Sequence, residues 1–97
     1  MGAQQTDQQL VERVQQGDNN AYNFLVIKYQ NKVASLVSRY VNNPGDVPDV
    51  TQDAFIKAYK ALATFRGESA FYTWLYRIAV NTAKNYLVAQ GRRPPAT

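Results

Sequence analysis

Cysteine and histidine are both absent from this 97-residue sequence. Their absence excludes a disulfide scaffold, the usual zinc sites, a thiol nucleophile and any histidine-based catalytic triad. Long apolar runs are missing too: the longest span four residues, as in Phe24–Ile27, whereas a membrane-spanning helix needs about 20. Residues 1–5 have neither a basic start nor an apolar stretch, so we expect no signal peptide and a soluble intracellular domain.

Proline is scarce and occurs only at positions 44, 48, 94 and 95, which leaves long stretches without a helix breaker. Apolar residues make up 45% of the chain and charged residues 19%, a balance typical of a globular protein. The length allows one domain with a modest core.

Helix caps and apolar spacing predict four helices, and no strand pattern competes with them. The first begins at a capping box formed by Thr6 and Gln9 and ends at Gly17. The second follows the N-cap Asp18, and its apolar residues recur every three or four positions as far as Tyr40.

The third and fourth predicted helices lie on either side of a short loop. The third has Asp46 as its N-cap and Pro48 in its first turn, and the fourth runs from about residue 70 to residue 90. We predict an all-α fold, a compact bundle of four helices. The core-facing residues expected on these two helices are Val47, Val50, Ala54, Ala58, Leu62, Leu75, Ile78, Ala79, Thr82 and Tyr86.

The net charge of +4 is unevenly distributed along the chain. Residues 1–54 carry four basic and six acidic side chains, whereas residues 55–97 carry seven basic side chains and one acidic side chain, Glu68. The C-terminal part is therefore expected to attract polyanions, and the N-terminal part suits a basic partner. Small basic domains that bind no nucleic acid are also common, so the asymmetry leaves both interpretations open.

Aromatic residues are concentrated around the loop before the fourth helix. Two interpretations of this cluster remain open: the rings belong to the core, or some of them form a platform on which unpaired bases stack. The loop Phe65–Ser69 combines an apolar wedge, a cation, a flexible glycine and two hydrogen-bonding side chains, a composition suited to an extruded base. The five aromatic residues are Phe65, Phe71, Tyr72, Trp74 and Tyr76.

A polar stripe follows one face of the predicted fourth helix. Arginine and lysine bind phosphates, and asparagine hydrogen-bonds base edges, although a solvated helix face has the same pattern. Beside the aromatic cluster and the basic C-terminal end, nucleic-acid binding is the favoured interpretation. The stripe consists of Thr73, Arg77, Asn81, Lys84, Asn85 and Val88.

An acidic ridge opens the predicted third helix, where Asp49 and Asp53 lie one turn apart with Gln52 between them. Two carboxylates without a third ligand make a poor metal site, and at an exposed helix start both stay ionised, which disfavours acid–base catalysis. Acidic residues at a helix N-terminus need no function, because they complement the helix dipole. The functional alternative is a surface that docks a basic partner helix.

Two segments, Asp49–Leu62 and Phe65–Asn85, resemble region 2 of the extracytoplasmic-function sigma factors. The likeness extends from about Asp7 to Pro95 and covers the N-terminal domain of that family alone. It implies that residues 1–91 form a sigma region 2 helical domain and that residues 92–97 begin a basic, proline-containing linker.

The resemblance also implies two functional surfaces. One binds the minus-ten promoter element and takes a flipped base of the non-template strand, and the other docks on the β′ clamp helices of RNA polymerase. The second surface would comprise Asp49, Gln52, Asp53, Lys57 and Lys60. The first surface would comprise Phe65, Arg66, Gly67, Glu68, Ser69, Ala70, Phe71, Tyr72, Trp74, Arg77, Asn81, Lys84, Asn85, Arg92 and Arg93.

The partners implied are promoter DNA, core RNA polymerase and a membrane-anchored anti-sigma factor, in a bacterial cytoplasmic protein of the envelope-stress response. We expect no cofactor, no metal and no small-molecule substrate. A pure protein-interaction module is the alternative, in which the basic face is merely solvated. An enzyme is disfavoured, because the sequence has no P-loop, no metal cluster and no nucleophile beside a base.

Overall fold

The computed structural model describes residues 5–91, and Arg92, Arg93 and the predicted linker lie outside them. The all-α prediction is confirmed: the described residues form four α-helices, two single-turn 3-10 helices and no strand. The elements are α1 (Asp7–Gln15), α2 (Asn19–Ser38), η1 (Pro44–Asp46), α3 (Val47–Ala61), η2 (Leu62–Thr64) and α4 (Phe71–Gly91).

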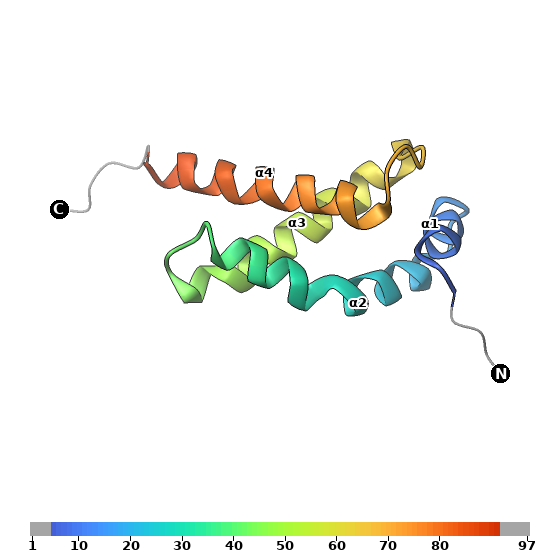
Figure 1. The fold of residues 1–97 in the computed structure, drawn as a ribbon, viewed down its shortest axis with the longest axis horizontal. Coiled ribbons are helices and arrows are strands. Elements are labelled where there is room, and N and C mark those ends of the chain that lie inside the picture. The colour runs from blue at the N-terminus through green and yellow to red at the C-terminus, as the bar shows by residue number, and fades with distance from the viewer. Residues whose placement is uncertain (1–4, 92–97) are drawn as a thin grey trace.

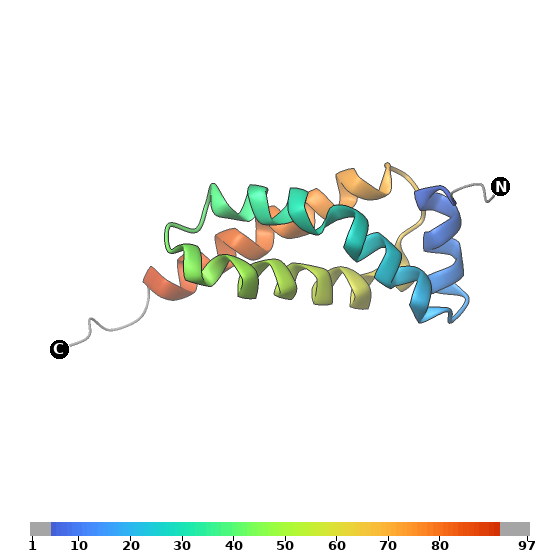
Figure 2. The ribbon, with the colours of Figure 1, turned by 90° about the horizontal axis from the view of Figure 1, so that it is seen from below.

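The three long helices lie along one another, and α1 packs across the end of the bundle where α2 begins (Figure 1). Helices α2 and α4 run in the same direction, and α3 runs in the opposite direction and packs against both. The loop of residues 65–70, which we call the recognition loop, lies at the same end as α1 (Figure 2).

The predicted caps of the first two helices are confirmed. The Thr6 hydroxyl accepts a hydrogen bond from the Gln9 amide at 3.1 Å, and the Gln9 side chain accepts one from the Thr6 amide at 2.9 Å. Gly17 then reverses the chain with a φ of +103°, a backbone angle that favours glycine. Asp18 caps α2 by accepting from the Asn20 amide at 3.2 Å.

The start of α3 differs from the prediction in one respect. Asp46 occupies the N-cap position, but its side chain makes no cap hydrogen bond. Its backbone is helical rather than extended, because η1 leads directly into α3, and the carboxylate is therefore not turned back onto the first turn of α3. The Asp46 carboxylate instead accepts a hydrogen bond from the Tyr86 hydroxyl and so ties α4 to this corner.

One continuous core joins the four helices. Three predicted core residues, Val47, Ile78 and Tyr86, are only half-buried, because they lie at the edges of the helix–helix contacts. Conversely, Phe55 and Ala83 are buried although the spacing did not single them out. The largest fully buried side chains are those of Leu25, Val33, Val37, Leu62 and Leu75.

Candidate nucleic-acid interface

The recognition loop has little hydrogen bonding of its own. The Phe65 amide donates to the Leu62 carbonyl at 3.1 Å as η2 ends, and the Trp74 amide donates to the Ala70 carbonyl at 3.1 Å as α4 begins. Between these points Gly67 has a φ of +74°, a left-handed angle that side chains other than glycine rarely adopt. The loop is therefore held at one end by η2 and at the other by the first turn of α4, and it projects from the end of the bundle.

Some rings of the aromatic cluster belong to the core, and others are accessible to a stacked base. Phe71 is only 4% exposed and belongs to the core, whereas Phe65 and Trp74 are half-buried. The ring centroid of Phe65 lies 4.8 Å from that of Trp74, and Phe71 supports Trp74 from below at 5.8 Å. Phe71 is thus placed beneath the surface, and the geometry gives it a supporting position rather than contact with a base.

A hollow of about 360 Å³ lies between the recognition loop and the first turns of α4. Its walls combine aromatic rings, which offer flat apolar surfaces, with hydroxyl and carboxylate groups and two guanidinium groups. No ion pair within residues 5–91 engages Arg66 or Arg77, so both are available to an anion. The lining residues are Thr64, Phe65, Arg66, Glu68, Ser69, Trp74 and Arg77.

A second opening, a cleft of about 820 Å³, lies on the other side of the recognition loop and faces α1. Gly67 and Ala70 line this cleft, not the hollow. Arg66 and Ser69 line both openings. The loop is therefore accessible from two sides, and its position depends on contacts at its base.

The predicted polar stripe is confirmed as a solvent-exposed face of α4. Arg77 lies at the hollow, but Asn81, Lys84 and Asn85 do not line it. At 1.5 Å of rise per residue, Asn81 lies roughly 6 Å and Asn85 roughly 12 Å further along the helix axis than Arg77. The stripe is thus a track that leads away from the hollow.

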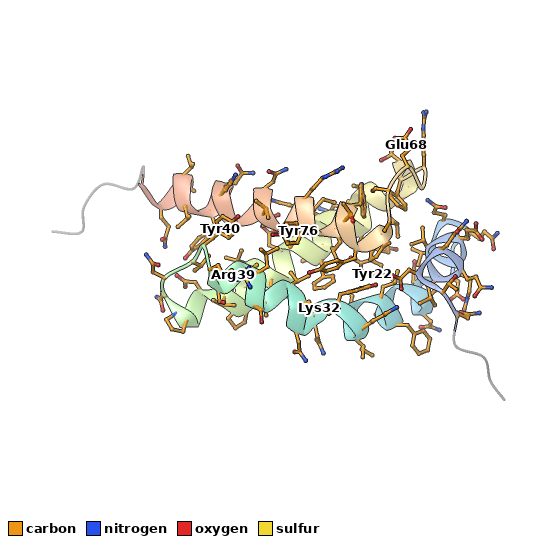
Figure 3. The ribbon with its side chains drawn as sticks, viewed as in Figure 1. Tyr22, Lys32, Arg39, Tyr40, Glu68 and Tyr76 are labelled. Carbon is orange, nitrogen blue, oxygen red and sulfur yellow. The ribbon has the colours of Figure 1, made fainter. Side chains whose placement is uncertain are left out.

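Tyr72 is separated from this face, although the sequence grouped it with the loop. Its ring stacks on Tyr29 of α2 at 5.1 Å, and the Lys32 ammonium lies 5.6 Å from the centre of the Tyr72 ring. Figure 3 shows Lys32, Arg39 and Tyr76 on this side of the molecule, between α2 and α4. Lys32 and Arg39 of α2 were not among the predicted site residues, because helical spacing does not reveal which helix lies opposite them.

The acidic ridge of α3 is exposed along its whole length, and so are Lys57 and Lys60. The Lys57 ammonium lies 3.5 Å from the Asp53 carboxylate, one helical turn away. Two apolar residues on the exposed side of α3 were missed: Ile56 is 45% exposed and Tyr59 is 41% exposed. Their position between the charged residues was visible in the sequence and is typical of a protein contact.

Beside this ridge lies a hollow of about 370 Å³ between α2 and α3. Val26 and Ala34 of α2 face Pro48 and Phe55 of α3 across it. An apolar groove flanked by carboxylates suits a partner helix with both apolar and basic side chains. Of the residues predicted for docking, Gln52 lines this groove, whereas the other residues that line it on α2 and α3 were not predicted.

An ion pair and a tyrosine hydrogen bond hold α1 against α2 beside the recognition loop. The Lys28 ammonium donates to the Asp7 carboxylate at 2.6 Å, and this hydrogen bond raises the pKa of Lys28. The Tyr29 hydroxyl donates to the same carboxylate, and burial raises the pKa of Tyr29. Within residues 5–91 no group of three or more carboxylates could hold a metal ion, and none of the described helices is long and apolar enough to cross a bilayer.

The chain belongs to the Sigma-70 region 2 family, whose family model matches residues 25–93. It is 76% identical over 97 residues to the ECF RNA polymerase sigma-E factor of Escherichia coli strain K12. It is 72% identical over 95 residues to the protein of that name from Haemophilus influenzae. The match covers 100% and 98% of this chain, respectively, but only 50% of each relative, so the chain spans about half of their length.

Among the solved structures that are similar to this fold, two bear on its function. One is the NMR structure of an engineered region 2 of sigmaE in complex with GTAAAA, with a TM-score of 0.91 and 70% identity over 99% of this chain and 100% of that chain. The other is CnrH in complex with the cytosolic domain of CnrY, with a TM-score of 0.75 and 30% identity. That match covers 81% of this chain and 51% of the CnrH chain.

Proposed function

We propose that this chain is the promoter-recognition domain of an extracytoplasmic-function sigma factor, and that it binds the single-stranded minus-ten element. One flipped base of the non-template strand would occupy the hollow beside the recognition loop. The observation that carries this proposal is the open, cation-bordered hollow lined by Phe65, Trp74, Arg66 and Arg77. The complex of an engineered sigmaE region 2 with GTAAAA supports it.

The energetics favour capture of an already open base. A domain without an ATPase motif supplies no energy for strand separation, so it must stabilise bases that have left the stack. Unstacking a base costs a few kcal/mol. Stacking on an aromatic ring returns about 1–3 kcal/mol, and hydrogen bonds in the hollow add to this.

The side chains at the hollow divide into three roles. The rings of Phe65 and Trp74 stack on the base, Glu68 and Ser69 hydrogen-bond its edge, and Arg66 holds a phosphate. Along α4, Arg77, Asn81, Lys84 and Asn85 guide the strand or the duplex next to it. Contacts from Gly67, Ala70, Tyr72, Arg92 and Arg93 stay predictions.

The second surface is proposed to dock on the β′ clamp helices of RNA polymerase through Asp49, Gln52, Asp53, Lys57 and Lys60. The exposed Ile56 and Tyr59 would add apolar contact. CnrH, which shares the fold, is bound to the cytosolic domain of CnrY, which supports an anti-sigma partner at the membrane. The domain would thus serve transcription initiation in the bacterial cytoplasm during envelope stress, and no reaction chemistry is proposed for it.

The DNA-binding half is tested with the hexamer GTAAAA and a hexamer of the same composition in another order, measured by fluorescence anisotropy. We expect selective binding, weakened about tenfold or more by Trp74→Ala because one base loses its stacking partner. Asn81→Ala should also weaken binding, whereas Asn23→Ala on the exposed face of α2 is the matched control. Equal affinity for both hexamers would show that the hollow does not read sequence.

The docking half is tested by the double substitution Asp49→Lys and Asp53→Lys. Binding to core RNA polymerase should weaken, because carboxylates that face a basic helix become repulsive, while affinity for GTAAAA should not fall. A chain that binds polymerase but no hexamer would instead be a pure protein-interaction module.

A further inference from the structure

The recognition loop is fixed at its base by a side chain from α1. The Gln15 amide nitrogen donates one hydrogen bond to the Leu62 carbonyl at 3.0 Å and another to the Phe65 carbonyl at 2.9 Å. These acceptors lie 47 and 50 residues further along the chain. A primary amide has two N–H hydrogens, so both are used.

Leu62 begins η2 and Phe65 caps its C-terminal end, so the two carbonyls lie on either side of this single turn. The Leu62 carbonyl also accepts from the Phe65 amide, whereas the Phe65 carbonyl follows the turn, where the helical hydrogen bonds have ended. No side chain caps η2 at its N-terminus, and the loop beyond it includes Gly67 in a left-handed conformation. Within the loop, Ser69 hydrogen-bonds only the carbonyl of its neighbour Ala70, at 3.4 Å. Gln15 therefore supplies a constraint that the loop does not supply for itself.

The peptide bond that Gln15 holds is the one that follows Phe65. The orientation of this peptide sets the direction in which residues 66–70 leave η2. The Phe65 ring on the same residue packs against Trp74 at 4.8 Å and forms a wall of the hollow. A movement of the Phe65 backbone would thus displace both the wall of the hollow and the loop above it.

Helix α1 is a rigid base for this contact. Leu10, Val11 and Val14 are buried in the core, and Asp7 at the other end of α1 is tied to Lys28 and Tyr29. Gln15 is the last residue of α1, next to the turn at Gly17. A long side chain from a fixed helix end holds a loop more firmly than one from a mobile segment.

We infer that Gln15 is the positioning residue of the recognition loop and that it sets the selectivity of the hollow for its base. This inference rests on the proposed function. Gln15 acts through the Leu62 and Phe65 carbonyls, so it changes the shape of the site without touching the base. No sequence pattern predicts this role, because a glutamine on an exposed helix face looks like ordinary surface.

The test compares Gln15→Leu and Gln15→Glu, neither of which can donate these hydrogen bonds, with Gln16→Leu as the matched control. Gln16 is also exposed, and its side chain makes no hydrogen bond within residues 5–91. Amide hydrogen exchange of residues 65–70 is first measured without DNA. We expect exchange to be roughly fivefold to tenfold faster in both Gln15 variants and unchanged in Gln16→Leu.

Affinities are then measured for GTAAAA and for six hexamers that each carry one replaced base. In the wild type we expect the most discriminated position to show about a tenfold preference or more. In both Gln15 variants this preference should fall to roughly twofold, while Gln16→Leu retains it. Thermal melting followed by circular dichroism shows whether the fold is retained.

Each of the other outcomes would overturn the inference. A lower melting temperature with unchanged selectivity would show a purely structural role, and weaker binding with unchanged loop exchange would show direct contact with DNA. If the wild type itself does not discriminate, the proposed function fails. The exchange data then still decide whether Gln15 holds the loop.

Discussion

At the scale of single residues, Asp18 shows how one side chain fixes the corner between α1 and α2. It caps α2 through the Asn20 amide, and it accepts a hydrogen bond from the Arg13 side chain at 2.9 Å. Hydrogen bonding from Arg13 lowers the pKa of Asp18 below its ordinary value of 3.8. The charge and the cap are separable, because asparagine also caps helices well.

Asp18→Asn should therefore keep the cap and lose the ion pair. A carboxyl group whose pKa is lowered on folding stabilises the native state above its unfolded pKa, and this contribution is lost as the pH falls through the native pKa. We expect the variant to be less stable than the wild type at neutral pH, with the difference disappearing as the pH falls below the native pKa of Asp18. Urea unfolding at a series of pH values measures this, and a difference independent of pH would contradict it.

At the scale of elements, α1 is short for an independent helix and depends on its cap and its packing. Isolated helices of fewer than about 12 residues are marginal in water, and α1 has nine residues. Its capping box, its three buried apolar residues and its contacts with α2 hold it in place, and through Gln15 it then supports the recognition loop.

Thr6→Ala should remove half of the capping box and destabilise the domain by about 1 kcal/mol. Gln8→Ala is the matched control, because Gln8 is exposed in the same turn and its only hydrogen bond within the described residues is long, at 3.4 Å to Glu12. The control should change stability by less than about 0.5 kcal/mol. Chemical denaturation gives both values, and equal effects would show that the cap contributes nothing specific.

At the scale of the whole molecule, the charged side chains are divided between faces. The exposed side of α3 carries the acidic ridge, and the exposed side of α4 carries Arg77 and Lys84 beside amide side chains. A strand on α4 and a protein on α3 would therefore bind at the same time, each at a face of suitable charge.

Replacement of one cation on each face tests this division. Lys84→Gln should lower the slope of log affinity for GTAAAA against log salt concentration by about 0.7, the value for one phosphate contact in a single strand. Lys60→Gln makes the same change of charge on α3 and should leave the slope unchanged. If both substitutions lowered the slope equally, the affinity for DNA would depend on the net charge of the domain and not on a binding face on α4.

The four helices, most of their buried stripes and the two charged faces could be predicted from the order of the amino acids alone. These features follow from the 3.6-residue period and from local caps, which depend on neighbours a few positions apart. Four further features became visible once the helices were packed together: Phe71 is buried, Tyr72 faces α2, Asp46 holds Tyr86 and Gln15 holds the recognition loop. Helical periodicity sets the direction of a side chain around its own axis, but which partner lies in that direction depends on how distant segments pack.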